Sequence, residues 1–206
     1  MTASIPIRMA VEDALSETVL RRVLDERLAR YEIGAVYSRG GYGYLKRQTG
    51  AFNNAAKAYP FLLLTDLDQY DCPPDLVTSW LSGQPKHNSF LFRVAVREVE
   101  SWLLADMARL APFLHLRNTP AISAPESLTD PKQELLRLSL GSRVRRVREA
   151  LVWRDSESGQ LHQGPDYNGT LAPFVMKHWD ISAARSVCPS LERLFAALQR
   201  LETEFA

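Results

Sequence analysis

The sequence predicts an α/β fold in which a mostly parallel sheet is flanked by helices and followed by a helical C-terminal part. Two observations predict it. Segments with strand and helix periodicity alternate over the first half of the chain, and the apolar run Phe61–Leu64 has the composition of a strand buried on both faces. Such alternation is typical of parallel sheets, because each crossover helix covers one face of the sheet.

Four strands are expected. The first, Ile5–Val11, leads directly to a carboxylate, Glu12. In the fourth, Phe90, Phe92 and Val94 recur with the period of two that a strand shows. The expected strands span residues 5–11, 33–37, 61–65 and 89–97.

Helices are expected between these strands. The first has one apolar stripe, and either Asp13 or Ser16 is placed to cap its start. That stripe comprises Leu20, Val23, Leu24 and Leu28. The expected helices span residues 14–31, 44–58 and 75–82, and a further helical segment follows Glu98.

The pattern changes after about residue 110. Prolines and polar residues replace the strand pattern, and helical periodicity returns only in parts. The expected segments are an irregular loop over 117–133, a helix over 133–153 broken at Gly141, a mobile loop over 154–169 and a final helix after Pro189 capped by Ser190.

Composition indicates an ordinary globular protein. The hydrophobic fraction is 46%, the charged fraction is 24% and the net charge is +1, so charge alone favours neither nucleic acid nor a membrane as partner. No apolar stretch has the length of a membrane span, and Pro6 and Arg8 interrupt any signal-peptide pattern. Cys72 and Cys188 lack metal spacing, and we expect free thiols in the cytoplasm.

The chemistry-bearing residues stand at the ends of the expected strands. Asp66 and Asp68 follow the apolar run, and Glu12 follows the first strand. The carboxyl ends of parallel strands meet at one edge of the sheet, which is where ligands bind in open α/β folds. Carboxylates held this close repel one another unless a divalent cation lies between them. The alternative for the two aspartates alone is a turn with solvated side chains.

The order of these motifs resembles a known domain. Val11-Glu12, then Thr65-Asp66-Leu67-Asp68, then a strand leading to Glu98 resembles the Toprim domain of topoisomerases, primases and OLD (overcoming lysogenization defect) nucleases. The segment Glu98–Asp106 resembles an uncharacterised bacterial Toprim-related family that has E-x-E-x-W-L-L-A-D at this place. Asp130-Pro131-Lys132 and the segment Trp179–Ser190 are also similar to that family.

The resemblance implies a single Toprim-like domain over residues 1–206, with a metal-site core over 1–110 and a loop-rich, helical extension over 111–206. It further implies a nuclease that cleaves nucleic-acid phosphodiesters with Mg²⁺ or Mn²⁺, serves bacterial defence against foreign DNA and works beside an ATPase. The sequence departs from the family pattern at Asp13, where relatives have glycine, and at Glu17, which lies one residue too late.

Metal-assisted cleavage of a phosphodiester needs hard oxygen ligands and a group that activates water. We expect Glu12, Asp66 and Asp68 to be catalytic and, together with Glu98, to hold the metal. Glu100 and Asp106 are expected to support these ligands without binding the metal directly.

Basic residues are the other part of a phosphate site. Arg39, Lys46 and Arg47 flank a glycine-rich stretch whose backbone N–H groups can hold an anion. The arginine strip, Arg143, Arg145, Arg146 and Arg148, lies on a helix whose buried stripe is expected to be Val144, Val147 and Leu151. This strip is expected to contact nucleic acid. A solvated helix face is the alternative.

Two other function classes stay open. Leu62–Asp68 also fits the opening motif of haloacid-dehalogenase phosphatases, in which Asp66 would be the nucleophile and Asp68 the acid. Tyr70 stands where that motif usually has Thr or Val, which counts against this class. The other class is a non-catalytic Toprim-like module that binds a partner.

Overall fold

The computed structural model describes residues 4–27, 29–38 and 40–205. These residues form two compact units. Unit 1 runs to Val96 and resumes at Ser190, and unit 2 spans Arg97–Pro189, so unit 2 is an insertion in the sequence of unit 1. The expected single domain with an extension from residue 111 stays a prediction.

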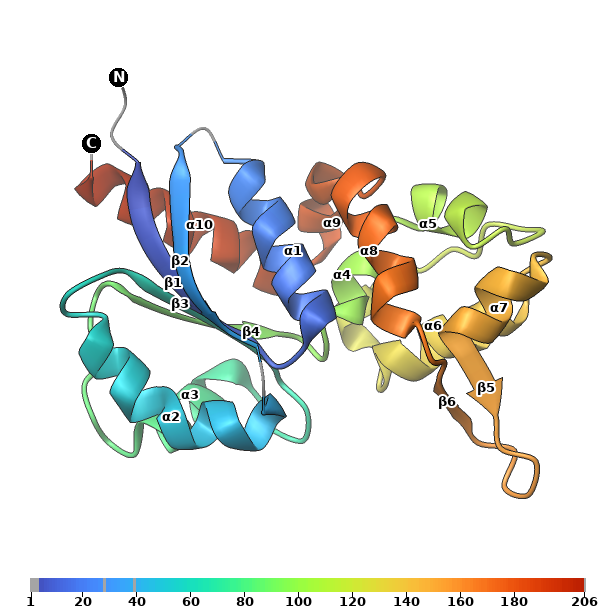
Figure 1. Ribbon diagram of the computed structural model, residues 1–206, viewed down its shortest axis with the longest axis horizontal. Coiled ribbons are helices and arrows are strands. Elements are labelled where there is room, and N and C mark those ends of the chain that lie inside the picture. Colours follow the sequence, from blue (N-terminus) through green and yellow to red (C-terminus); the bar gives the residue numbers. More distant parts are fainter. Residues whose placement is uncertain (1–3, 28, 39, 206) are drawn as a thin grey trace. The chain divides into compact units, whose positions relative to one another are not determined.

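Unit 1 contains a four-stranded parallel sheet with the strand order β2-β1-β3-β4 (Figure 1). The strands are β1 (Ile5–Ala10), β2 (Tyr31–Tyr37), β3 (Phe61–Asp66) and β4 (Phe90–Ala95). All four lie at the expected places in the sequence. The parallel sheet and its flanking helices confirm the predicted α/β class.

Helices cover both faces of this sheet. They are α1 (Ala14–Asp25), α2 (Gly41–Ala55), α3 (Pro73–Leu81) and α10 (Pro189–Glu204). Figure 1 shows α2 and α3 on one side of the sheet and α1 and α10 on the other. The chain therefore leaves the adjacent strands β1 and β3 toward opposite faces. Ligands of open α/β sheets bind at such a topological switch point, at the carboxyl ends of the strands.

Apolar residues of β3 explain why this strand is central. All six of its residues are buried, because helices cover both of its faces. Toward α2, the rings of Phe61 and Phe52 stack at 4.7 Å between centroids, and Phe90, Phe92 and Trp80 continue the same cluster. The run that indicated a buried strand in the sequence is thus the centre of the core of unit 1.

Of the two predicted caps of α1, Asp13 is the one observed, since its Oδ1 accepts a hydrogen bond from Ser16 N at 2.8 Å. Two helix bounds differ from expectation. Helix α1 ends at Asp25, earlier than expected, and the expected stripe residue Leu28 lies outside the described residues. Helix α2 begins three residues early because Gly40 adopts φ +113°, and a Cβ at Gly40 would lie 2.7 Å from Tyr44 Cβ.

Side chains satisfy backbone groups along β4, the edge strand. Lys86 Nζ donates to Phe90 O at 3.0 Å, and Arg93 Nε donates to Phe92 O at 2.7 Å. Ser190 Oγ accepts from Val96 N at 3.3 Å instead of capping the last helix, which begins at Pro189. These side chains take up hydrogen-bonding capacity of the backbone along this edge strand.

Unit 2 consists mainly of short helices. Its elements are α4 (Glu100–Leu104), α5 (Met107–Phe113), a 3-10 turn (Pro125–Ser127), α6 (Pro131–Leu140), α7 (Arg145–Leu151), β5 (Val152–Arg154), β6 (Leu161–Gln163), α8 (Tyr167–Lys177) and α9 (Ile181–Val187). The predicted helix break at Gly141 is confirmed, since α6 ends at Leu140 and α7 begins at Arg145.

The expected mobile loop over 154–169 is wrong. Residues 152–163 form an antiparallel hairpin, and α8 begins at Tyr167. The turn is ordered by Asp155, whose Oδ1 accepts from Ser158 N at 2.7 Å and from Glu157 N at 3.2 Å. Strands of three residues are too short to show a period of two, so the sequence pattern carried no strand signal.

None of the described helices has the length and apolar character needed to cross a bilayer.

An ion pair joins α10 to the segment after α1. Arg27 donates two hydrogen bonds to the Glu202 carboxylate, at 2.8 and 2.6 Å, and Tyr31 Oη donates a third at 2.9 Å. The Arg27 hydrogen bond is the main cause that lowers the pKa of Glu202 below its ordinary 4.5. A lowered pKa means that the folded state holds this proton less tightly than the unfolded state. Stability from Glu202 is therefore present above pH 4.5 and is lost as the pH falls through the lowered pKa.

We expect Glu202→Gln to lower the free energy of unfolding by about 1–2 kcal/mol at pH 7. The difference from wild type should shrink as the pH falls below about 4. Urea unfolding at several pH values measures it, with the exposed Glu204→Gln as the matched control. An equal loss at pH 7 and at pH 3 would contradict a role for the ionised pair.

Candidate functional site

Glu12 is held at the switch point between β1 and β3. It follows β1 by two residues, and its Oε1 accepts hydrogen bonds from Thr65 Oγ1 and, at 3.0 Å, from Asp66 N. The structure thus brings the Glu12 carboxylate against the last two residues of β3. Two donors on one oxygen fix the orientation of this carboxylate.

The two aspartates differ in their settings. Asp66 is the last residue of β3, pairs in register with Ala95 and is only 9% exposed. Asp68 is exposed and has φ +48°, a left-handed conformation that Asp adopts more readily than most residues. The chain turns sharply there, directly beyond the carboxyl end of β3.

Burial raises the pKa of Glu12 above its ordinary 4.5. The hydrogen bonds from Thr65 and Asp66 N act against this shift, whereas the negative charges of Asp68 and Asp13 add to it. The half-buried Glu12 carboxylate lies close to other carboxylates, and its negative charge is stabilised when it binds either a proton or a metal cation. The chemistry of these donors, all carboxylate oxygens, suits a hard divalent cation.

Helix α2 contributes basic and polar groups next to the turn that carries Asp68. Lys46 Nζ donates to Tyr70 Oη at 3.4 Å, and Tyr70 Oη lies 3.1 Å from Ser79 Oγ. The negative charge of Asp68 also contributes to the raised pKa of Tyr42, behind burial and the Tyr70 hydrogen bond. No sequence prediction assigns Tyr70 to the site, although its hydroxyl, two residues after the aspartates, is a visible signal.

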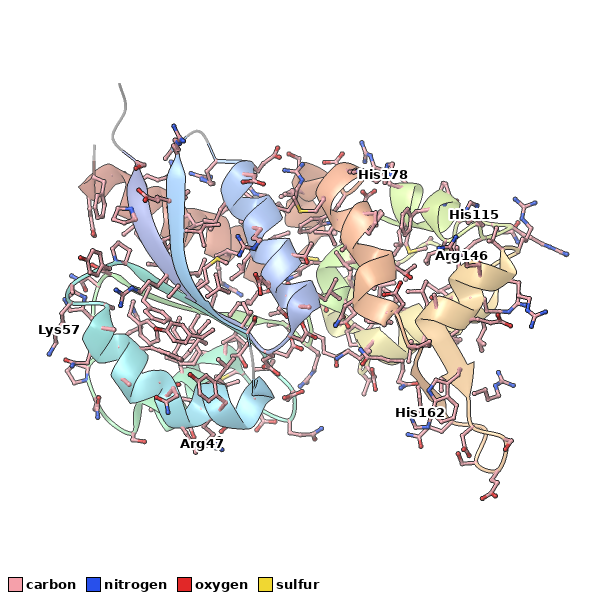
Figure 2. All side chains as sticks on the ribbon, in the orientation of Figure 1. Arg47, Lys57, His115, Arg146, His162 and His178 are labelled. Atoms are coloured by element: carbon pink, nitrogen blue, oxygen red, sulfur yellow. The ribbon has the colours of Figure 1, made fainter. Side chains whose placement is uncertain are left out.

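Of the other predicted phosphate-binding residues near α2, the structure describes only Arg47. Figure 2 labels Arg47 on the side of α2 that faces away from the sheet, and its side chain is exposed. Arg39 lies outside the described residues. The N-cap of α2 is Gly40, which has no side chain to cap the first turn, and the N–H groups of an uncapped helix start can bind an anion.

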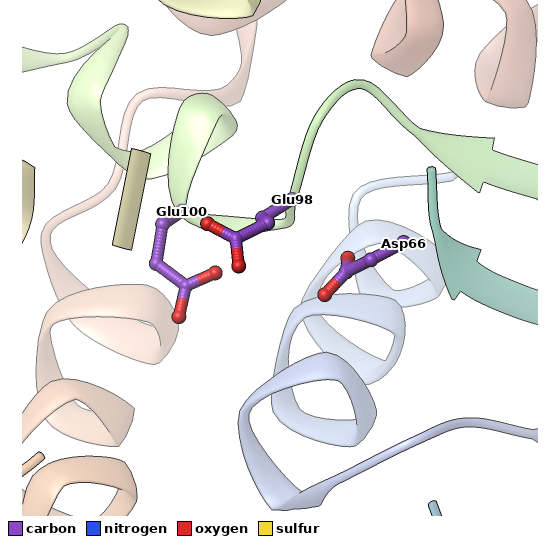
Figure 3. A group of neighbouring side chains, drawn as sticks. All are labelled: Asp66, Glu98 and Glu100. Carbon is purple, nitrogen blue, oxygen red and sulfur yellow. The ribbon is translucent and has the colours of Figure 1, made fainter. Parts of the chain in front are cut away.

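Glu98 and Glu100 belong to unit 2, where the ammonium group of Lys132 pairs with both carboxylates. Lys132 Nζ lies 3.3 Å from Glu98 Oε1 and 3.7 Å from Glu100 Oε1. Lys132 N also donates to Glu98 Oε2 at 2.8 Å, so Glu98 caps the start of α6. Glu100, 2% exposed, accepts from Tyr167 Oη at 3.0 Å. Figure 3 shows Glu98 and Glu100 at the start of α4, and separately Asp66 at the end of β3.

Asp106 has structural partners in unit 2. Its Oδ1 accepts from Arg109 N at 3.3 Å and caps α5, and its Oδ2 accepts from Asp180 N at 2.8 Å. Arg109 pairs with Asp180 at 2.8 Å and completes the group. Trp179 Nε1 donates to Trp102 O at 3.1 Å beside it. These contacts give most of the motif Glu98–Asp106 a role in holding unit 2 together.

Both cysteines are free thiols, as predicted. Cys188 is buried, its Sγ lies 3.7 Å from Ser101 O, and burial raises the pKa of its thiol to about 12. A thiol in this state is unreactive at neutral pH.

The arginine strip lies around the start of α7. Arg143, Arg145 and Arg146 are exposed, and Arg145 Nε pairs with Glu149 at 2.6 Å. Arg148 is half-buried and donates to Ser142 O at 2.9 Å. The expected buried stripe was wrong in one member, since Val144 is 37% exposed and precedes the helix, whereas Leu151 is buried.

A family model described as "Domain of unknown function (DUF4276)" matches residues 11–199. The chain belongs to this family. No curated protein matches it. Among solved structures, the C-terminal region of the Burkholderia pseudomallei OLD protein is similar, with a TM-score of 0.47 and 17% sequence identity over 93% of this chain and 97% of that chain.

The DUF4276 match takes in residues from both units. It begins one residue before Glu12 and extends past Asp180, so every carboxylate proposed for the metal lies within it. Glu202, whose ion pair with Arg27 stabilises unit 1, lies beyond the matched range.

Proposed function

We propose that this DUF4276 protein is a metal-dependent, nuclease-like Toprim protein that acts on nucleic-acid phosphodiesters. The observation that carries the proposal is the placement of Glu12 against the end of β3. Carboxylates from two adjacent parallel strands meet at the topological switch point, where ligands of such sheets bind. The resemblance of the Glu and Asp-x-Asp order to the Toprim domain supports the same chemistry.

Glu12, Asp66 and Asp68 are the proposed ligands of Mg²⁺ or Mn²⁺. Oε1 of Glu12 is occupied by Thr65 and Asp66 N, which leaves Oε2 for the cation. Glu98 is proposed as a further ligand because only Val96 and Arg97 separate it from β4. Its contacts with Lys132 would have to loosen for it to bind metal. Glu100 and Asp106 are assigned supporting roles within unit 2.

The cation, when bound, neutralises phosphate charge and makes water more acidic. The residues of the chain do the rest. Oε2 of Glu12 either holds the cation or accepts a proton from the attacking water. Lys46 and the N–H groups at the start of α2 hold the phosphate oxygens. The arginine strip of unit 2 contacts the nucleic-acid backbone.

The biological role proposed from the family resemblance is bacterial defence against foreign DNA together with an ATPase, in the cytoplasm. The natural assay partner is the product of the neighbouring gene, supplied with nucleotide. Plasmid, single-stranded DNA and RNA are the substrates to compare, with EDTA as the metal control.

We expect the double variant Asp66→Asn, Asp68→Asn to lose the stabilisation by metal. In wild type, 10 mM Mg²⁺ or Mn²⁺ should raise the melting temperature because the cation binds the native state and relieves carboxylate repulsion. The double variant should melt no lower than wild type in EDTA and should not respond to metal. Differential scanning fluorimetry measures both.

The matched control is Asp25→Asn with Glu204→Gln, which removes the same charge from exposed positions of unit 1. This control should keep the full metal response. A metal response that survives in the Asp66 and Asp68 variant would exclude these ligands. Metal binding without cleavage of any substrate, partner included, would favour the non-catalytic module, and EDTA-sensitive release of phosphate from a monoester would favour the phosphatase.

A further inference from the structure

One large aromatic side chain of unit 2 faces solvent. Trp153 is 48% exposed, whereas Trp80, Trp102 and Trp179 are buried. Its ring stacks on that of His162, its partner across the hairpin, with centroids 4.5 Å apart and planes 20° apart. Because His162 covers one face of the indole, the exposed fraction belongs to the rest of the ring. The pair forms a flat aromatic surface at the outside of the hairpin.

The hairpin holds this surface in place. Val152, next to Trp153, is 3% exposed and packs inward. Gln133 Nε2 donates to Leu161 O at 3.2 Å, which ties the hairpin to α6. Gly164 N donates to Leu151 O at 2.9 Å and closes the base of the hairpin. A surface fixed in this way loses little conformational freedom when a ligand stacks on it.

Exposed arginines lie near the aromatic pair in the chain, and the charge of Asp155 also acts on His162. Arg143, Arg146 and Arg154 are exposed, and within the described residues none of them has a carboxylate partner. Figure 2 labels Arg146 on α7 and His162 on the hairpin that follows it. Helix and strand rises place Arg146 at most about 14 Å along the chain from Trp153, a span of a few nucleotides.

We propose that Trp153 and His162 stack an unpaired nucleobase while these arginines contact the adjoining phosphates. The ligand of this surface is single-stranded nucleic acid. Bases within a duplex stack on one another and offer no free face, whereas unpaired bases stack on aromatic side chains irrespective of sequence. This inference rests on the proposed function for its nucleic-acid partner. It adds that unit 2 prefers single-stranded to double-stranded nucleic acid.

A purely structural role for Trp153 makes a different prediction. Cross-strand aromatic pairs stabilise hairpins on their own. A hairpin that needs only this pair would melt lower when Trp153 is replaced but would bind nucleic acid unchanged. Trp153→Thr keeps a strand-forming residue and removes the aromatic face, and Trp153→Phe keeps a smaller aromatic face.

The test is binding of a fluorescein-labelled oligothymidylate and of a duplex of equal length, both in EDTA. Trp153→Thr should bind the single strand roughly 5- to 150-fold more weakly, the range expected for loss of one stacked base, and Trp153→Phe should recover most of the affinity. Binding of the duplex should change less than about twofold. Oligothymidylate should also quench the exposed tryptophan emission of wild type but not that of Trp153→Phe.

The arginines are tested by salt dependence. Arg143→Gln with Arg146→Gln should reduce the slope of log affinity against log salt by about 1.4 for the single strand, about 0.7 for each lost phosphate contact. Exposed Lys177→Gln, with Arg185→Gln, is the charge-matched control in unit 2 and should leave the slope unchanged. Equal single-strand affinity of wild type and Trp153→Thr, or an equal loss for single strand and duplex, would overturn the inference.

The two proposals fail separately. Cleavage that depends on metal and Glu12 but binding of single strands that ignores Trp153 would overturn this inference alone. Trp153-dependent binding of single strands in a chain without metal-dependent cleavage would sustain the inference and overturn the nuclease.

Discussion

Glu12→Gln is expected to lower metal-dependent cleavage by about 10²- to 10⁴-fold, the range for loss of a positioned base or ligand. The fold should survive, because the amide oxygen of Gln can accept the same hydrogen bonds from Thr65 and Asp66 N. In metal-free buffer the variant should melt higher than wild type at pH 7, since it removes a half-buried negative charge that Asp68 and Asp13 repel.

The pH dependence of this variant has a definite sign. Burial raises the pKa of Glu12 in the folded state, so the folded chain binds the Glu12 proton more tightly than the unfolded chain. The contribution of Glu12 to stability is therefore greatest at low pH and falls as the pH rises from the ordinary 4.5 through the raised pKa. Glu12→Gln should lack this decline, and Mg²⁺ should reverse it in wild type only.

Thermal melts between pH 4 and pH 8, with and without Mg²⁺, measure both effects. Glu32→Gln, an exposed carboxylate on β2, is the control. Cleavage by Glu12→Gln at the wild-type rate would remove Glu12 from the active site. A lower melting temperature at pH 7 would show that the ionised carboxylate stabilises the fold without metal.

Lys132→Met is expected to lower the free energy of unfolding by about 2–4 kcal/mol, slightly below the range for breaking a fully buried ion pair. The ammonium faces Glu98 and Glu100, and the side chain of Glu100 is only 2% exposed. Met retains most of the length of Lys, so the loss reports the charge and not a cavity.

The melting temperature of Lys132→Met should fall by roughly 5–10 °C, and protection from proteolysis should be lost first in unit 2. Lys177→Met, an exposed lysine of α8, is the control and should change stability by less than about 0.5 kcal/mol. A Lys132→Met chain as stable as this control would mean that the two glutamates do not depend on the ammonium.

Most of the secondary structure of unit 1 could be predicted from the sequence. The buried run at β3 and the alternation in β4 are short-range patterns, and the rule that parallel strands end at one edge placed Glu12 with Asp66. The contact of Glu12 with Thr65 and Asp66 N follows from that register. Whether these residues bind metal stays a prediction.

Unit 2 was much less accessible from sequence, because its contacts are long-range. Lys132 lies 34 residues from Glu98 in the sequence, and no local pattern links the two. Two glycines also misled the prediction of a loop. A Cβ at Gly164 would lie 2.3 Å from Ala150 O, and one at Gly169 would lie 2.1 Å from Asp166 Oδ1. These glycines permit close packing beside a hairpin and within a helix, and give no sign of mobility.

The place of α10 in unit 1 has a consequence for synthesis. Leu191, Leu194 and Leu198 of α10 are fully buried, yet they leave the ribosome after the whole of unit 2. At the usual 5–20 residues per second, roughly 5–20 s pass between the synthesis of β4 and that of α10, the last helix of unit 1. Unit 2 is complete before then and is free to fold first. The carboxylates beyond β1 and β3 therefore reach their final setting only after α10 has been synthesised.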